Sequence, residues 1–186
     1  MSNKWKIVLG LVIMLSIGAF VMTKITKDDL EKIEKAVGSV HGTAAHIEIV
    51  HIEEMDHNRA IVFHEMYSRG RRLTVVELKK TFFGWTFESG FSGRSNKDRR
   101  SSVLSNYAII VGRVPSNNYY EVKIEATNGN VYSAKFIEEN GIKKYWYYIT
   151  EEMSEFEEIN DATVYAVTED GEVIEEIEKP DNEPLY

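Results

Sequence analysis

The chain has 186 residues, no cysteine and a formal net charge of −8. This length allows one domain with its own core beside a short apolar segment, rather than two domains. The absence of cysteine excludes disulfides, thiolate catalysis, iron–sulfur clusters, cysteine zinc sites and a lipoprotein anchor. The acidic balance argues against nucleic acid as a partner.

An apolar segment near the amino terminus, Ile7–Met22, has sixteen residues and no charge. Two lysines flank it on each side, Lys4 and Lys6 before it and Lys24 and Lys27 after it. A helix of that length spans roughly 24 Å, which is enough to cross a bilayer when the terminal lysines reach toward the headgroups. We therefore expect residues 1–25 to form a single-pass anchor in the cell membrane. The lysines on its two sides do not decide the orientation. A tail of a few residues before the apolar run and a large domain after it is the arrangement of a translocated signal-anchor, so we expect the domain to be extracytoplasmic.

Two other interpretations of this segment are open. It could be a secretory signal peptide with a weak small-x-small cleavage site at Ser16 and Gly18, although the apolar run continues beyond that site. It could also be a buried helix of a soluble domain, but such helices are rarely apolar on every face.

Residues 26–40 are expected to form a short helix and linker. An acidic first turn precedes apolar residues at helical spacing, which are Leu30, Ile33 and Val37. We predict an amphipathic helix over Lys27–Val37 that ends at Gly38.

From His46 onward, β-branched and aromatic residues occur in a series of short runs. The dipeptides Asn128-Gly129, Asn140-Gly141 and Asp170-Gly171 indicate hairpin turns. The pattern predicts a mostly β fold with one antiparallel β-sandwich or partly open barrel over residues 41–178 and a disordered tail at residues 179–186. Strands are predicted at about 47–52, 60–63, 73–78, 82–87, 107–114, 119–126, 131–138, 144–149, 163–168 and 173–177.

Two polar stretches are predicted to lie between strands. Residues 89–102, rich in Gly, Ser and Arg, are predicted to form one long loop. The acidic run Glu151–Glu158 lacks the spacing of an EF-hand, so we interpret it as a solvated connector.

A basic block gives the first candidate binding site. Residues 69–100 carry a formal charge of +6, whereas residues 101–186 carry −12. The phosphates of lipids or wall polymers could be bound by the basic side chains of the loop, which are Arg94, Lys97, Arg99 and Arg100. The alternative is a solvated loop whose charge is balanced by the acidic carboxy-terminal half.

The most aromatic run, Tyr145-Trp146-Tyr147-Tyr148, gives the second candidate. Alternation along a strand places Tyr145 and Tyr147 on one face, and Trp146 and Tyr148 on the other. One face has to be core, and the other could contact a glycan or a protein. Packing alone also accounts for aromatic residues in strands.

All five histidines lie between His41 and His64. Imidazoles close in space could hold zinc or copper, with His46, His51 and His64 as the candidate ligands. No H-x-H or H-E-x-x-H motif is present, and histidines scattered over a surface are the competing interpretation.

Several segments together resemble an uncharacterised family of small membrane-anchored or secreted proteins from Bacillus-type bacteria. The likeness covers most of residues 45–175 and is carried by 49–54, 59–63, 79–85, 112–114, 134–138, Trp146 and 170–174. This family has no known activity, so the resemblance implies an architecture and a location but no function.

The sequence favours a non-enzymatic binding module at the cell envelope, held by Ile7–Met22 and contacting an envelope protein or an anionic polymer. It contains no catalytic serine motif and no phosphate loop, and we expect no cofactor. The alternatives are an extracytoplasmic metal-dependent hydrolase that uses the His41–His64 cluster, and a structural or small-ligand-holding barrel.

Overall fold

The computed structural model describes residues 27–41, 46–55, 58–67, 71–94, 99–114 and 118–177. These residues form two helices and twelve strands, which are α2 (Lys27–His41), β1 (Ile47–Met55), β2 (Arg59–Tyr67), β3 (Arg71–Thr81), β4 (Gly84–Arg94), β5 (Arg99–Val103), β6 (Ala108–Arg113), β7 (Glu121–Glu125), β8 (Val131–Ser133), β9 (Lys135–Glu139), β10 (Ile142–Thr150), α3 (Met153–Asn160), β11 (Thr163–Val167) and β12 (Val173–Glu176). The expected anchor and the expected tail lie outside the described residues. Neither described helix is both long and apolar enough to span a bilayer.

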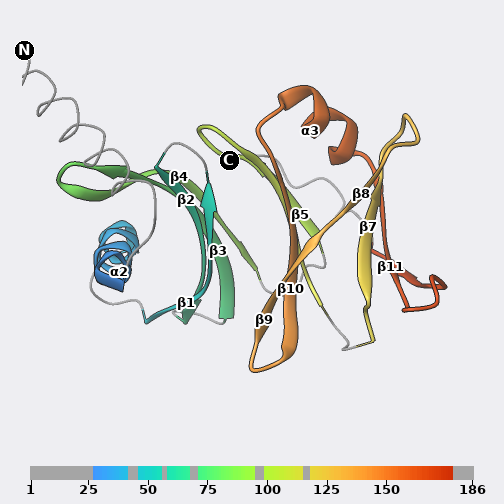
Figure 1. Cartoon of the computed structure of the whole chain (residues 1–186), viewed down its shortest axis with the longest axis horizontal. Coiled ribbons are helices and arrows are strands. Elements are labelled where there is room, and N and C mark those ends of the chain that lie inside the picture. Colours follow the sequence, from blue (N-terminus) through green and yellow to red (C-terminus); the bar gives the residue numbers. More distant parts are fainter. Residues whose placement is uncertain are drawn as a thin grey trace, which may run out of the picture.

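The expected mostly β, antiparallel architecture is confirmed. Sheet A has the strand order β1-β2-β3-β4, sheet B the order β5-β6-β10-β9, and sheet C the order β12-β11-β7-β8. All pairings within them are antiparallel. Figure 1 shows α2, sheet A, sheet B and sheet C following one another as layers, so sheet B is covered on both faces.

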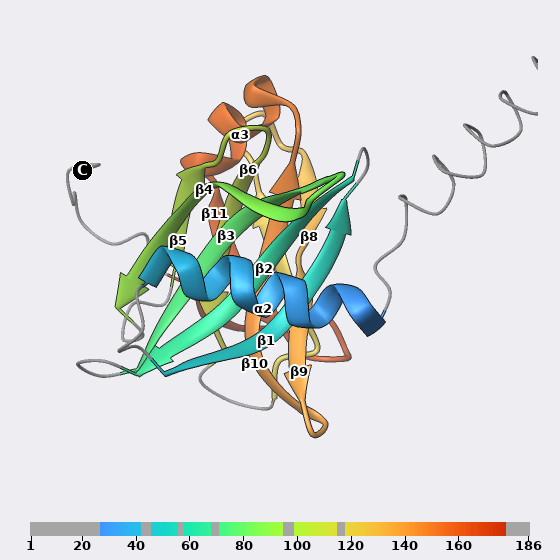
Figure 2. The ribbon, with the colours of Figure 1, turned by 90° about the vertical axis from the view of Figure 1, so that its left-hand side faces the viewer.

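Helix α2 covers the outer face of sheet A (Figure 2). Its buried stripe is Ile33, Ala36 and Val37, which pack against β2 and β3 through residues such as Val62 and Leu78. The 3.6-residue period of a helix places these three positions on one side. Packing therefore fixes α2 to the domain.

The predicted end of this helix at Gly38 is wrong. The helix continues through one further turn to His41. Ser39 Oγ donates to the Ala36 carbonyl at 2.7 Å, and the His41 ring contacts His64 of β2. Contacts with the sheet stabilise the last turn although glycine disfavours a helix interior.

Strict alternation divides the core between the layers. In β2, Ile61 and Phe63 face sheet B, while Ala60 and Val62 face α2. In β6, Ile109 faces sheet A and Ile110 faces sheet C. Because successive strand residues point to opposite faces, each central strand contributes to two separate cores.

The predicted loop over residues 89–102 is also wrong. Strand β4 continues to Arg94 and β5 begins at Arg99, so only residues 95–98 lie outside the described residues. Gly90 allows close packing here, since a Cβ on it would lie 2.8 Å from both the Val75 carbonyl oxygen and Val76 Cγ1. The glycine that suggested a loop therefore lies within a strand.

Two further elements differ from prediction. The acidic connector contains helix α3, which buries Ile159 against the core between sheets B and C. The single strand predicted at 131–138 is interrupted at Ala134, and its halves, β8 and β9, belong to different sheets. Apolar periodicity cannot locate such a transfer between layers.

Candidate functional site

The aromatic run of β10 lies in the core on both of its faces. Tyr145 and Tyr147 point toward sheet A and Trp146 and Tyr148 toward sheet C, as alternation predicted. Trp146 is fully buried, and Tyr145 and Tyr147 are at most 5% exposed. Tyr148 is half-buried and donates to Glu155 of α3 at 2.9 Å. Because sheet B is a middle layer, these side chains join layers, and the expected aromatic contact surface is not formed by them.

The two buried tyrosines of β10 bind carboxylates of sheet A. Tyr145 Oη donates to Glu65 at 2.5 Å, and Tyr147 Oη donates to Glu53 at 2.7 Å. Burial raises the pKa of Tyr147, and its bond to Glu53 raises it further. Burial alone would raise the pKa of Glu53, but hydrogen bonds from Lys135, Tyr147 and His51 outweigh it and the pKa is lowered.

Arg99, one of the four basic candidates, has a structural role. It is 2% exposed and donates to the carbonyls of Ile159 at 2.9 Å, Asn160 at 2.9 Å and Ala162 at 2.7 Å. Ile159 and Asn160 are the last residues of α3 and Ala162 follows the helix, in a segment whose carbonyls need donors from outside the helix. This guanidinium therefore holds α3 on sheet B and does not face a polymer.

The other basic candidates are less defined. The aliphatic part of Arg100 lies against Gly93, where a Cβ would approach Arg100 Cδ to 2.5 Å. Lys97 and the side chain of Arg94 lie outside the described part of the chain. The structure thus places two of the four residues, and both lie against neighbouring elements.

The three histidines proposed as metal ligands are separated. His51 faces sheet B, where its Nε2 lies 3.1 Å from Tyr147 Oη and 3.3 Å from Glu53 Oε2. His64 faces α2, on the opposite side of sheet A. His46 is exposed, with its ring 5.7 Å from that of Tyr67. Within the described ranges, no group of three His, Asp or Glu side chains could hold a metal ion.

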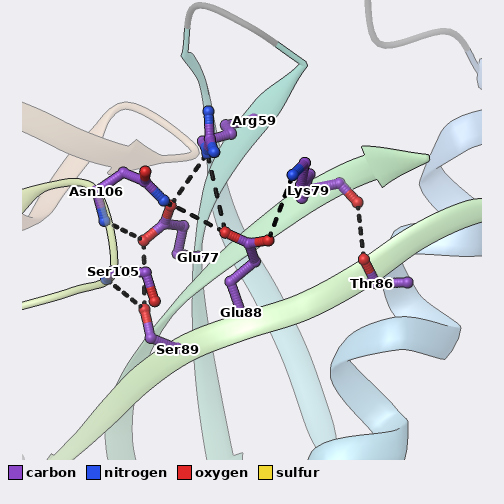
Figure 3. Close-up of polar contacts among 8 residues, drawn as sticks. All are labelled: Arg59, Glu77, Lys79, Thr86, Glu88, Ser89, Ser105 and Asn106. Atoms are coloured by element: carbon purple, nitrogen blue, oxygen red, sulfur yellow. Dashed lines mark hydrogen bonds and ion pairs between the residues drawn. The ribbon is translucent and has the colours of Figure 1, made fainter.

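A buried carboxylate that the sequence analysis did not single out joins sheet A to the turn between β5 and β6 (Figure 3). Glu77 is fully buried. It accepts hydrogen bonds from the Asn106 backbone N at 3.1 Å and from Asn106 Nδ2 at 2.6 Å. Ser89 Oγ donates at 3.3 Å, and Arg59 Nε lies 3.4 Å away. Glu77 follows Leu73 and Val75 at intervals of two residues, which places all three on the same face of the strand. This spacing was the only sequence signal that its side chain points inward.

The largest exposed apolar feature of sheet A is the turn between β3 and β4, which we call the hairpin tip and define as Phe82 and Phe83. These side chains are 83% and 95% exposed, and their rings contact each other edge to face with centroids 5.4 Å apart. The prediction that both lie in a strand is wrong, since the turn falls at these two residues and Gly84 has a φ of +117°. Thr81 stabilises the turn by donating from Oγ1 to the Gly84 carbonyl at 2.8 Å.

The hairpin tip is connected to the start of α2 by a buried carboxylate. Asp29, in the first turn of α2, is 4% exposed. It pairs with Lys80 Nζ at 2.8 Å and accepts from Trp85 Nε1 at 3.3 Å. Lys80 and Trp85 are cross-strand partners immediately below the turn. The first turn of α2 and the base of the hairpin tip therefore form one rigid unit.

Comparison of the chain with protein-family models, with curated proteins and with solved structures found no match. The resemblance noted from the sequence therefore stays a prediction.

Proposed function

We propose that this chain is a single-pass membrane protein, anchored by Ile7–Met22, whose sandwich-like β domain is a non-enzymatic binding module on the outer side of the cell membrane. The proposal combines the uncharged amino-terminal segment with the packing of α2, the first described element of the domain, against sheet A. It assigns the module to the cell envelope.

The observation that carries the proposal is the position of α2. Only four residues separate Met22 from Lys27, the first residue of α2. Ile33 and Val37 of this helix are fully buried in the core that it shares with sheet A. A helix fixed in this way positions the domain close to the end of the apolar segment, without a long flexible linker. A domain held this close to the apolar segment suits a module that binds its partner at the surface of the membrane in which it is anchored.

The described polar groups favour binding over catalysis. Glu65 and Glu77 are fully buried and accept hydrogen bonds from other layers, so their carboxylates stabilise the stacking of the sheets. His51 and His64 face opposite sides of sheet A, which prevents them from sharing one metal ion. No feature of the residues that the structure describes favours the hydrolase over the binding module.

Fractionation of the full chain tests the location. We expect the protein to remain with membranes after an alkaline wash and to float with liposomes. A chain that keeps its amino-terminal segment and stays in the aqueous fraction would contradict the anchor. Metal analysis of the same purified protein tests the hydrolase, which requires a stoichiometric ion.

Cysteine labelling tests the orientation, because the natural chain has no cysteine. Asp170→Cys, in the turn between β11 and β12, should react with a membrane-impermeant maleimide on intact cells. Ser2→Cys, before the apolar segment, should react only after lysis. The cysteine-free parent gives the background, and the reverse pattern would place the domain inside.

A further inference from the structure

We propose that the hairpin tip, Phe82 and Phe83, inserts into the surface of the bilayer that holds Ile7–Met22 and so forms a second membrane contact of the same domain. This inference rests on the proposed function and adds to it the ligand of one surface, the interfacial region of a lipid bilayer.

The composition of the turn is the first support. Turns between strands usually carry polar residues, and in this turn the positive φ falls on Gly84, so its backbone requires no particular residue type at positions 82 and 83. Here both turn positions are phenylalanine, and 83% and 95% of their surfaces are exposed. Single exposed apolar residues are ordinary, but two adjacent aromatic rings on a projecting turn indicate a site that contacts something apolar.

The surroundings of the tip also suit a lipid interface. Residues 81–87 contain no charged side chain, and Phe87, which follows in β4, is 42% exposed. Lys79 lies just below the turn, and its side chain is 46% exposed with the ammonium 3.9 Å from Glu88, so lipid phosphates can reach it. Lys80 is held by its ion pair with Asp29. Amphipathic segments with aromatic residues beside basic ones lie in the interface with their apolar side buried by roughly 5–10 Å. Basic residues next to them are attracted to anionic headgroups.

The position of the tip relative to the anchor is the third support. Five Cα–Cα steps join Met22 to Lys27, so α2 begins within roughly 17 Å of the end of the apolar segment. Asp29 holds the base of the hairpin tip against the first turn of α2 through Lys80 and Trp85. Figure 1 shows the β3–β4 hairpin extending past sheet A over the side occupied by α2, and Figure 2 shows its turn on the side where α2 begins. The tip and the anchor therefore leave the domain near one another.

A fluorescent probe beside the intact tip tests the contact. The full chain carrying Thr86→Cys, labelled with an environment-sensitive fluorophore, is reconstituted into phosphatidylcholine–phosphatidylglycerol vesicles that contain lipids with a doxyl quencher near the headgroup. Thr86 is exposed and lies two residues past the turn-ending Gly84, so both phenylalanines remain in place. The same label on Asp170→Cys, in the turn between β11 and β12 of sheet C, is the matched control.

We expect at least about twofold stronger quenching at position 86 than at position 170, and a loss of that difference in the Phe82→Ser/Phe83→Ser variant. Both phenylalanines are exposed, so the double variant should keep the unfolding temperature of the parent, which circular dichroism checks. Equal weak quenching at the two positions would overturn the proposal. Quenching that the serine variant retains would overturn it as well, because the phenylalanines would not cause it.

Three further outcomes show whether this inference, the proposed function or both would fail. A blue-shifted probe at position 86 that lipid quenchers do not reach would mean contact with protein, such as a second copy of the chain, and would overturn the lipid contact. A chain that does not float with the vesicles would overturn the anchor and this inference together. A chain that floats with position 86 in water would overturn the tip contact alone.

Discussion

His41 at the end of α2 and His64 in the middle of β2 form a direct imidazole pair, with their Nε2 atoms 3.0 Å apart. One ring must donate and the other must accept, so the contact needs at least one neutral imidazole. His64 is fully buried, and its Nδ1 has no hydrogen-bond partner among the described residues. Burial, and to a smaller extent the neighbouring His41, lower the pKa of His64 to about 4.

The first prediction is therefore a loss of stability in mild acid. The pKa of His64 is lower in the folded chain than its ordinary value of 6.5 in the unfolded chain, so the unfolded chain binds more protons between these two values. The free energy of unfolding should fall as the pH decreases from 6.5 to about 4, by roughly 3 kcal/mol from this residue. Urea unfolding of the full chain in mild detergent over this range measures it.

The control for this prediction is the exposed His46. His64→Gln cannot titrate and should reduce the pH dependence between 6.5 and 4, whereas His46→Gln should leave it unchanged. Burial also lowers the pKa of His41, which contributes to the remaining slope. An unchanged slope in His64→Gln would mean that other groups cause the acid sensitivity.

The second prediction concerns Glu77, whose carboxylate accepts hydrogen bonds from Asn106 in the turn between β5 and β6. Glu77→Gln keeps the shape but removes the charge opposite Arg59 and places an amide where two Asn106 donors converge. We expect a loss of about 2–4 kcal/mol in the free energy of unfolding, because a buried charge partner is removed. Glu88→Gln is the matched control, since its side chain is 25% exposed and its ion pairs with Arg59 and Lys79 are both 3.9 Å long. It should cost under about 1 kcal/mol.

Local sequence patterns predicted the strand faces but not what would cover them. Alternation along Tyr145–Tyr148 gave the correct two faces of β10. Whether the second face is solvated depends on sheet C, which is built from residues such as Val122 and Val164 that are distant from one another in the chain. Such long-range stacking leaves no local signal, which is why a contact surface was expected where a second core exists.

The hairpin tip is a second place where the local sequence pattern was not sufficient, here because an exposed turn was predicted to be a strand. Phe82 and Phe83 stand in an aromatic run that indicates a strand by composition. The positive φ of Gly84 and the bond from Thr81 place the turn at these two residues instead. The aromatic run alone predicted a strand at the two most exposed phenylalanines described in the chain, and only the hairpin register shows that they lie in a projecting turn.

The third prediction compares two glycines that the sequence alone cannot distinguish. A Cβ at position 90 would lie 2.8 Å from the Val75 carbonyl oxygen, whereas a Cβ at position 38 meets nothing within 4 Å. Gly90→Ala should lower the free energy of unfolding by about 1–3 kcal/mol, since the strands must separate. Gly38→Ala should raise it by about 0.5–1 kcal/mol, since alanine favours a helix interior. Thermal unfolding of both variants measures the opposite signs, and a destabilised Gly38→Ala would contradict the extension of α2 beyond Gly38.

The last prediction concerns the ion pair that connects α2 to the hairpin. Lys80 Nζ lies 2.8 Å from Asp29 Oδ2, and the two side chains are only 13% and 6% exposed. Asp29→Asn keeps an acceptor for Trp85 but removes the charge, and Lys80→Met keeps the aliphatic length without the ammonium group. Each single variant should lose about 2 kcal/mol, because it leaves the other charge poorly solvated. The double variant should lose less than the sum, with a coupling free energy of about 1–3 kcal/mol.

The pair Lys123–Glu121 provides the control for this double-mutant cycle. Its atoms are 3.7 Å apart and its side chains are about one-third exposed, so its coupling should be under about 0.5 kcal/mol. Hydrogen exchange adds a local measurement, because loss of the Asp29–Lys80 pair should accelerate exchange in the first turns of α2 more than in α3. Additive single variants would mean that apolar packing alone holds the hairpin against α2, and that the charge pair does not set the position of the tip.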